Sequence, residues 1–359
     1  MQGRPSDVTE HKVCCVEVLK TTFGPREYGS KWQIVTMGAL RADPASEQEF
    51  GLSRVKDGMH LAGQAIFGPI SYFLGQSIVP VVALSNDLSW MKCIGTGFFV
   101  SCSGLLVTAA HVIADPIESN YAASREVASF RWQSDAVTLG VMVPGNPLMG
   151  ARGYFFRKVE WATFLAERAD SPLPFRQPSL KLNADIAICK VQQPDALSPY
   201  QPLALIQKGI RGYGAEVGKR ATAIGYGEMK DQIQLTLSGG HVECDLPFQL
   251  SISSGVVLEQ FADNAISRAS PSPGPCFSAS LPLPPGMSGS PIFDHEGIYV
   301  HGVASMGLSD SSGPTDHGYG SMLAHAIHLP ISPLQGNSLA DVTRAGTDGI
   351  IIMQGPGDL

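Results

Sequence analysis

The feature that most constrains this chain is a short loop in its last third, in which a serine stands between two glycines. The residues Gly286-Met287-Ser288-Gly289-Ser290-Pro291 precede the apolar pair Ile292-Phe293. Glycine permits backbone conformations that other residues avoid, so such a loop can hold a hydroxyl clear of the backbone and turn amide N–H groups toward one point. A nucleophilic serine requires both. The structural alternative is a plain turn between two strands, since turns of this composition are common.

Two other residues have contexts that match this serine. Thr108-Ala109-Ala110-His111 ends an apolar run, and Asp185 opens the apolar run Ile186-Ala187-Ile188. The order is therefore histidine, aspartate, serine. The α/β-hydrolases run serine, aspartate, histidine and need a glycine where this chain has Ser290, whereas subtilisins run aspartate, histidine, serine. Alone, His111 is better explained as a strand-end residue and Asp185 as a turn residue, but three matching contexts favour one site.

With these motifs in register, the chain resembles the chymotrypsin-fold, trypsin-like serine peptidases, and most closely their intracellular and HtrA-like bacterial members. The longest match is Ile94-Gly95-Thr96-Gly97-Phe98-Phe99-Val100 followed by Leu105 to His111, the hairpin at whose end the family holds its catalytic histidine. The resemblance implies a mainly β protein with two six-stranded antiparallel β-barrels. The first would cover about 76–192 and the second about 217–335, which opens at Gly218–Gly227.

The resemblance also implies a serine endopeptidase that hydrolyses peptide bonds of protein substrates through an acyl-enzyme. Ser288 would attack the carbonyl, His111 would take and return the proton, and Asp185 would orient the imidazole. The backbone N–H groups of Gly286 and Ser288 would form the oxyanion hole. Ser290 is the competing nucleophile by proximity, but it does not occupy the motif position.

The substrate-binding residues implied by the family are Ser305, Met306 and Gly307, in a strand that pairs with an extended substrate. The second pocket wall would be Gly320-Ser321-Met322. Relatives that cut after Lys or Arg carry a carboxylate about six residues before the nucleophile. Here that region is Ser280-Leu281-Pro282-Leu283, which has no acid.

This apolar region predicts the cleavage preference. A cation in such a slot would lose its hydration at a cost of several kcal/mol, whereas an apolar side chain would gain about 25 cal/mol per Å² of buried area. We therefore expect cleavage after Ala, Val, Leu or Met. Asp310 and Asp316, between the two wall strands, are the acids that would change this preference if they folded back into the slot.

Met287 bears on regulation. Trypsin-like zymogens place an aspartate just before the nucleophile, where it pairs with a new N-terminus, and a thioether cannot form that ion pair. We expect control by a partner or by loop ordering, with a regulatory protein bound through the N-terminal extension as the partner hypothesis. The alternative function is a catalytically silent trypsin-like scaffold that serves as a protein-binding module.

Charge and cysteine usage narrow the partners and the compartment. A net charge of −7 without a basic block disfavours nucleic acid. The cysteines show no zinc spacing, and His325 and His328 have no third ligand nearby, so neither a metal nor a cofactor is expected. Seven cysteines cannot all pair within the chain, Val112 follows His111 where secreted relatives carry a bridged cysteine, and the first twenty residues lack an apolar signal core. We expect a cytoplasmic, bacterial protein.

The remaining segments give the domain organisation. Residues 1–60 are an N-terminal extension with a β-hairpin expected from Val13–Leu19 and Trp32–Met37, and 336–359 are a tail with a helix over 338–345. The uncharged run 61–86 is long enough to cross a bilayer, but Gln64, Pro69, Gln76 and Pro80 interrupt it, so we expect a barrel strand over 77–84 instead. Residues 113–180 are expected to form an enlarged inter-strand loop region with candidate strands at Val137–Val143 and Tyr154–Trp161, and 240–244 a strand of the second barrel.

Overall fold

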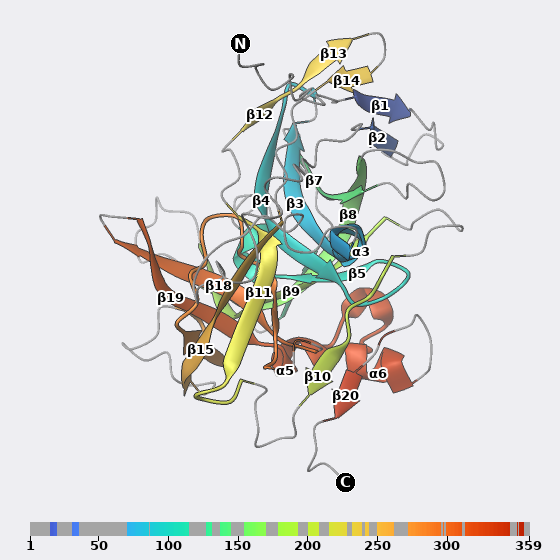
Figure 1. Ribbon diagram of the computed structural model, residues 1–359. Helices are drawn as coiled ribbons and strands as arrows, with labels where there is room; N and C mark the ends of the chain where they lie inside the picture. Colours follow the sequence, from blue (N-terminus) through green and yellow to red (C-terminus); the bar gives the residue numbers. More distant parts are fainter. Residues whose placement is uncertain are drawn as a thin grey trace, which may run out of the picture.

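The computed structural model describes most of the chain from residue 70 onward and two short strands before it. The described residues are 15–19, 31–35, 70–85, 87–114, 127–130, 137–144, 154–169, 179–192, 200–207, 215–227, 232–238, 241–243, 250–261, 272–295, 297, 299–310, 313–344, 350 and 352–354. Their strands form two sheets, each of which contains a closed barrel (Figure 1).

The first barrel consists of six antiparallel strands. They are β3 (Ile78–Ser85), β4 (Trp90–Phe99), β5 (Leu105–Thr108), β7 (Val137–Pro144), β8 (Tyr154–Ala169) and β9 (Ser179–Val191). Their spatial order is β8-β7-β3-β4-β5-β9, and pairing of β8 with β9 closes the barrel. The strand expected over 77–84 is confirmed as β3, whose eight residues are all buried.

The second barrel has the same construction. Its strands are β11 (Arg220–Tyr226), β15 (Leu250–Phe261), β16 (Cys276–Ala279), β17 (Pro291–Phe293), β18 (Val300–Asp310) and β19 (Gly313–Met322). They follow the order β17-β11-β15-β16-β19-β18, and pairing of β17 with β18 closes the ring. The predicted fold class, two six-stranded antiparallel barrels, is confirmed.

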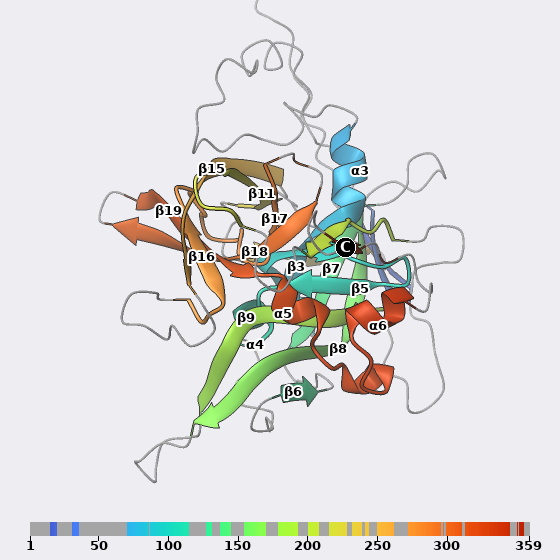
Figure 2. The ribbon, with the colours of Figure 1, turned by 90° about the horizontal axis from the view of Figure 1, so that it is seen from below.

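Further strands extend the first sheet, and two expectations need correction there. The strand expected over 240–244 exists as β14 (His241–Glu243), but it pairs with β1 (Cys15–Leu19) and β13 (Thr236–Ser238), not within the second barrel. Within the enlarged loop region expected over 113–180, the two candidate strands are present as β7 and β8, and a third strand that was not predicted, β6 (Val127–Phe130), corrects that expectation. β8 and β9 run side by side as a long ribbon (Figure 2) and stay paired from Val159↔Val191 to Ala169↔Ser179.

The N-terminal extension joins the same sheet. β1 pairs antiparallel with β2 (Lys31–Val35), and β2 pairs with β8. From the other direction, β12 (Ile233–Gln234) pairs with β4. The extension and a segment of the second half of the chain therefore both add to the first sheet. The boundaries drawn at residues 60, 76 and 335 stay predictions.

Short helices and two parallel strands complete the description. The helices are α3 (Ile70–Ser77), α4 (Ala110–Ala114), α5 (Ala324–Ile327), the 3-10 helix η4 (Ser332–Leu334) and α6 (Leu339–Arg344). The helix expected in the tail is confirmed as α6. β20 (Ile352–Gln354) pairs parallel with β10 (Leu205–Gln207), which pairs with β18. None of the helices in the described part of the chain has the length and apolarity needed to cross a membrane.

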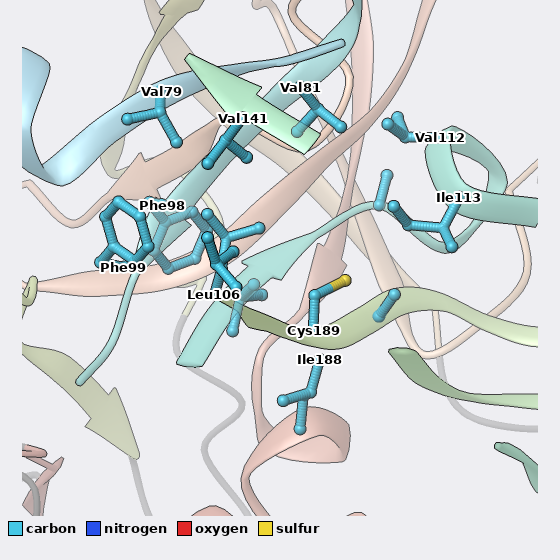
Figure 3. Packing of buried hydrophobic residues seen from close by; sticks show 14 of the residues in the cluster. Val79, Val81, Phe98, Phe99, Leu106, Val112, Ile113, Val141, Ile188 and Cys189 are labelled. Carbon is cyan, nitrogen blue, oxygen red and sulfur yellow. The ribbon is translucent and has the colours of Figure 1, made fainter. Parts of the chain in front are cut away.

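The core of the first barrel holds the helix that carries His111. Phe98 and Phe99 of β4 are fully buried, and Ile188 of β9 belongs to the same buried cluster (Figure 3). Val112 and Ile113 of α4 belong to the same buried cluster, at 2% and 1% exposure. Burying a side chain of this kind contributes about 1.5–3 kcal/mol. The residues that follow His111 therefore anchor α4, while His111 itself stays partly exposed.

Candidate active site

The structure brings the three residues singled out in the sequence to one place, although they come from three separate elements. His111 lies in α4, directly after β5, and Asp185 lies in β9, which pairs with β5. Ser288 lies in the loop between β16 and β17 of the other barrel. The loop contacts the first barrel directly, because the backbone N–H of Thr96 donates to the Ser288 carbonyl at 2.8 Å.

His111 and Asp185 make two hydrogen bonds. Nδ1 of His111 lies 2.8 Å from Oδ2 of Asp185, and the backbone N–H of His111 donates to Oδ1 at 3.0 Å. An ionised carboxylate only accepts, so Nδ1 carries the proton and the lone pair of the neutral imidazole is on Nε2. The His111 side chain is 32% exposed and the Asp185 side chain 4%. The partly exposed His111 therefore has a basic Nε2, and the buried Asp185 carboxylate holds its ring in place.

Burial acts on the pKa of Asp185 against its partners. Burial by itself raises that pKa, because it penalises the charged form. The hydrogen bond and charge of His111, the Ser305 hydroxyl and the His111 backbone N–H all lower it, and together they leave the pKa below its usual value. The stability that this adds is present above the carboxyl group's ordinary pKa and is lost as pH falls through the depressed one. Asp185 is therefore ionised near neutral pH.

Ser305 links Asp185 to Ser288, through its hydroxyl on one side and its backbone carbonyl on the other. The Ser305 hydroxyl donates to Oδ2 of Asp185, and the Ser272 hydroxyl lies 3.0 Å from the Ser305 hydroxyl. The Ser288 hydroxyl donates to the Ser305 carbonyl oxygen at 3.1 Å. Ser305 was expected only as a substrate-binding residue, and Ser272 was not singled out. Both roles depend on contacts between distant strands, which no local pattern reports.

The backbone before Ser288 forms a tight turn. The Met287 N–H donates to the Pro284 carbonyl at 3.1 Å, and Gly286 has a φ of +97°. Proline at the second position and a positive φ at the third are the pattern of a type II turn, which explains Pro285 and Gly286. In such a turn the carbonyl and N–H of the central peptide are fixed. Thr96 Oγ1 donates to the Gly286 carbonyl at 2.9 Å and holds the turn from the first barrel.

Thr96 is the residue whose importance the sequence did not reveal. Besides its two bonds to the serine loop, its Oγ1 accepts from the Tyr226 N–H of β11 at 2.9 Å, and its carbonyl accepts from Thr108 Oγ1 at 2.7 Å. Thr96 thus joins both barrels around the nucleophile loop. Its place between Gly95 and Gly97 in the matched hairpin was the available signal.

Gly289 shows how closely the loop sits on that residue. Its φ is +89°, and a methyl group there would overlap the Thr96 carbonyl oxygen and Thr108 Oγ1. The Gly289 N–H donates to the Ala304 carbonyl at 2.7 Å. Only glycine satisfies both the backbone conformation and the space.

The other two residues of the motif are buried. Ser290 has no exposed surface, and its Oγ lies against the Cα of Gly225, so it faces the barrel wall. Met287 also has no exposed surface and packs in the apolar cluster of the second barrel. Of the two serines in this motif, Ser288 is partly exposed and Ser290 is buried.

The two strands expected to form the walls of the slot beside Ser288 lie in contact with the segment that precedes the serine loop. A methyl group on Gly307 would overlap the Leu283 carbonyl oxygen, and one on Gly318 would lie 2.5 Å from the Leu281 carbonyl and 2.8 Å from Leu283 Cδ1. The residue of β19 that faces this region is therefore Gly318. Gly320, which was predicted there, faces Phe277 and Ile292 in the barrel interior, so that prediction is wrong.

The other predicted wall residues lie as follows. Ser305 is 3% exposed, whereas Met306 is 39% exposed on β18. Asp316 is exposed on β19, and Asp310 ends β18 opposite Gly313. Leu283, which is 6% exposed, packs against Gly318 and Gly307 of these two strands.

The described cysteines and possible metal ligands complete the account of the site. Cys93 and Cys189 are free thiols, Cys102 and Cys276 likewise form no disulfide, and burial raises the pKa of Cys93 to about 12. Within the described residues, no three His, Cys, Asp or Glu side chains gather as a metal site would require.

Two closed barrels with histidine and aspartate on the first and a serine loop on the second define a chymotrypsin-fold protein. The family model of the trypsin-like peptidase domain matches residues 95–300, more than half of the chain. The chain belongs to that family, and it is a serine endopeptidase by class. The predicted family is thus confirmed.

Solved structures with a similar chain path were also found. One is described as "Crystal structure of Deg5", with 16% identity, covering 71% of this chain and 88% of that one, at a TM-score of 0.38. An HtrA-type protease, AlgWS227A with a decapeptide, has 13% identity, 77% and 66% coverage and a TM-score of 0.40. Rv3671c from M. tuberculosis H37Rv, a Ser343Ala mutant in an inactive form, has 14% identity, 81% and 97% coverage and a TM-score of 0.37. A comparison with curated protein sequences found no significant match.

Proposed function

We propose that this protein cleaves protein substrates with Ser288 as nucleophile, His111 as general base and Asp185 as the group that orients His111. The observation that carries the proposal is the connected set of bonds from His111 through Asp185 and Ser305 to Ser288. His111 Nε2 would take the Ser288 proton during attack and return it to the leaving amine. Asp185, ionised and buried, would stabilise the imidazolium that forms.

The Ser288 hydroxyl must first change its partner. It donates to the Ser305 carbonyl, and for attack it must turn about its Cα–Cβ bond and donate to His111 instead. In the trypsin-like family the strand of Ser305, Met306 and Gly307 pairs with an extended substrate. A substrate backbone N–H that bonded to the Ser305 carbonyl would displace the Ser288 hydroxyl from that acceptor. Substrate binding would thereby favour the attacking rotamer.

The oxyanion hole is assigned to the N–H groups of Gly286 and Ser288. The type II pattern around Gly286 supports this, because it fixes the peptide between Pro285 and Gly286, and Thr96 holds that turn. Losing one donor of this kind costs about 3–4 kcal/mol of transition-state stabilisation in other enzymes.

Regulation without N-terminus insertion is the second part of the proposal. The buried thioether of Met287 supports it, since the position holds no acid for an ion pair. Docking of the extension through β2 onto β8 gives a bound regulatory protein a route to the first sheet. We further propose that the protein works in a reducing cytoplasm, which the free thiols support.

The alternative is a catalytically silent scaffold that binds proteins. Covalent labelling separates it from the peptidase. A fluorophosphonate with a plain alkyl chain should label the wild-type protein and S290A, and should not label S288A. S290A is the matched control, since it removes the same hydroxyl two residues away. No labelling of the wild-type protein would favour the scaffold, and loss of labelling in S290A alone would reassign the nucleophile.

A further inference from the structure

The slot beside Ser288 is closed by the chain itself. Strands β18 and β19 present Gly307 and Gly318 toward the segment before the serine loop. The Leu283 carbonyl is packed against Gly307, so closely that a single methyl group there would overlap it. The Leu283 Cγ and Cδ1 atoms lie against Gly318, at 3.0 and 2.8 Å from the position of an added Cβ. The walls are therefore in contact.

Leu283 is held in this position by the interior of the second barrel. It is 6% exposed and belongs to a buried cluster with Leu281, Met287 and Phe277. Moving it out would return a buried apolar side chain to water and leave a space in the barrel, and both changes are unfavourable. The side chain is thus a fixed part of the wall.

The close contact between the two strands and Leu283 depends on the two glycines opposite it, Gly307 and Gly318. Without a Cβ on Gly307 or Gly318, the strands can approach the 281–283 backbone directly. Side chains at those two positions would have held the strands apart. The space that an apolar substrate side chain would need is thereby given to Leu283.

We propose that Leu283 sets the cleavage specificity, by restricting the substrate residue whose carbonyl is attacked to glycine or alanine. This rests on the proposed function, and it replaces the expected preference for Ala, Val, Leu or Met with a preference for the smallest residues. Glycine has no side chain and alanine has only a methyl group, so neither needs to enter the slot. An isobutyl or benzyl side chain needs the volume that Leu283 occupies.

Peptidyl diphenyl phosphonates test the proposal. Four probes would be reacted with the wild-type protein. They are identical except for the substituent on the carbon bonded to phosphorus, which is hydrogen, methyl, isobutyl or benzyl. We expect the hydrogen and methyl probes to react about 10–200-fold faster than the isobutyl probe, the range that small differences in a pocket produce. L283A should reverse much of this difference and raise the isobutyl-to-methyl ratio at least about tenfold.

The controls separate specificity from folding and from the chemistry. V257A removes apolar atoms from the same buried cluster on β15 and should leave the probe ratio unchanged. L283V removes fewer side-chain atoms and should change the isobutyl-to-methyl ratio in the direction expected for L283A. It serves as the test if L283A does not fold. The plain fluorophosphonate reports the nucleophile alone, so its failure would count against the proposed function. Faster reaction of the wild-type protein with isobutyl or benzyl, or a ratio that L283A and L283V do not change, would overturn the role of Leu283.

Discussion

The two barrels hold their parts of the site by different means. In the first barrel, large side chains such as Phe98, Phe99 and Phe156 fill the core, and buried residues on either side of the site fix His111 and Asp185. The second barrel has a smaller cluster, in which five of twelve residues are alanine. Its serine loop is held by backbone bonds, including Gly289 N–H to the Ala304 carbonyl at 2.7 Å and Ser290 N–H to the Met287 carbonyl at 3.0 Å.

The two halves of the site are therefore sensitive to different kinds of substitution. The function of the His111–Asp185 pair depends on the functional groups of the two side chains. Packing of the neighbouring residues fixes their positions, and a substitution of one polar group for another of the same size leaves that packing intact. The serine loop depends on the space around its backbone, because its bonds and turns leave no room for a Cβ. A change of one functional group should therefore damage the first half, and one added methyl group the second.

The largest effect is expected from D185N. The amide would donate to His111 Nδ1 and favour the wrong tautomer, while the packing stays the same, so kcat should fall about 10⁴-fold with little change in fold. Peptide hydrolysis and circular dichroism would measure the two quantities. D294N is the control, because Asp294 is a buried acid of the second barrel that accepts from the Tyr299 N–H at 3.3 Å. If D185N retained most of its activity, Asp185 would not orient His111.

An intermediate effect is expected from G289A. The added methyl would overlap the Thr96 carbonyl oxygen, and alanine disfavours a φ of +89°. We expect the free energy of unfolding to fall by about 3 kcal/mol or more, the sum of strain and overpacking. G218A is matched in backbone conformation, with a φ of +82°, but has open space around it. It should cost only about 1–2 kcal/mol in urea unfolding. Equal costs would show that space around the serine loop is not limiting.

The smallest effect is expected from a reducing agent. Cys93 and Cys189 in the first barrel and Cys276 in the second form no disulfide, so packing rather than a disulfide stabilises the described part of each barrel. The melting temperature should be the same with and without reductant. Losing a structural disulfide costs about 2–5 kcal/mol, which would lower the melting temperature by several degrees. A fall of that size would mean that a bridge outside these cysteines stabilises the protein.

What the sequence predicted and what it missed follow from the range of the interactions. The contexts of His111, Asp185 and Ser288 are contiguous, so short patterns singled them out, and the structure places them in three elements that meet. Thr96 escaped because its bonds join residues far apart in the chain. The strand at His241–Glu243 was visible as a strand, but its partner was not, since an apolar pattern does not specify which strand it pairs with. Leu283 was recognised as apolar, yet only the structure placed it against Gly307 and Gly318.

The pairing of β1 with β14 has a consequence for synthesis of the chain. Val16 lies opposite Val242, so β1 leaves the ribosome long before β14, the strand that pairs with its outer edge. Contacts of such long range form slowly, because a large loop must close before they are rewarded. Until residues 236–243 emerge, the outer edge of β1 has none of its ladder bonds on that side, and a bare strand edge invites pairing with other chains. Nascent chains shorter than this should be the species most prone to aggregate.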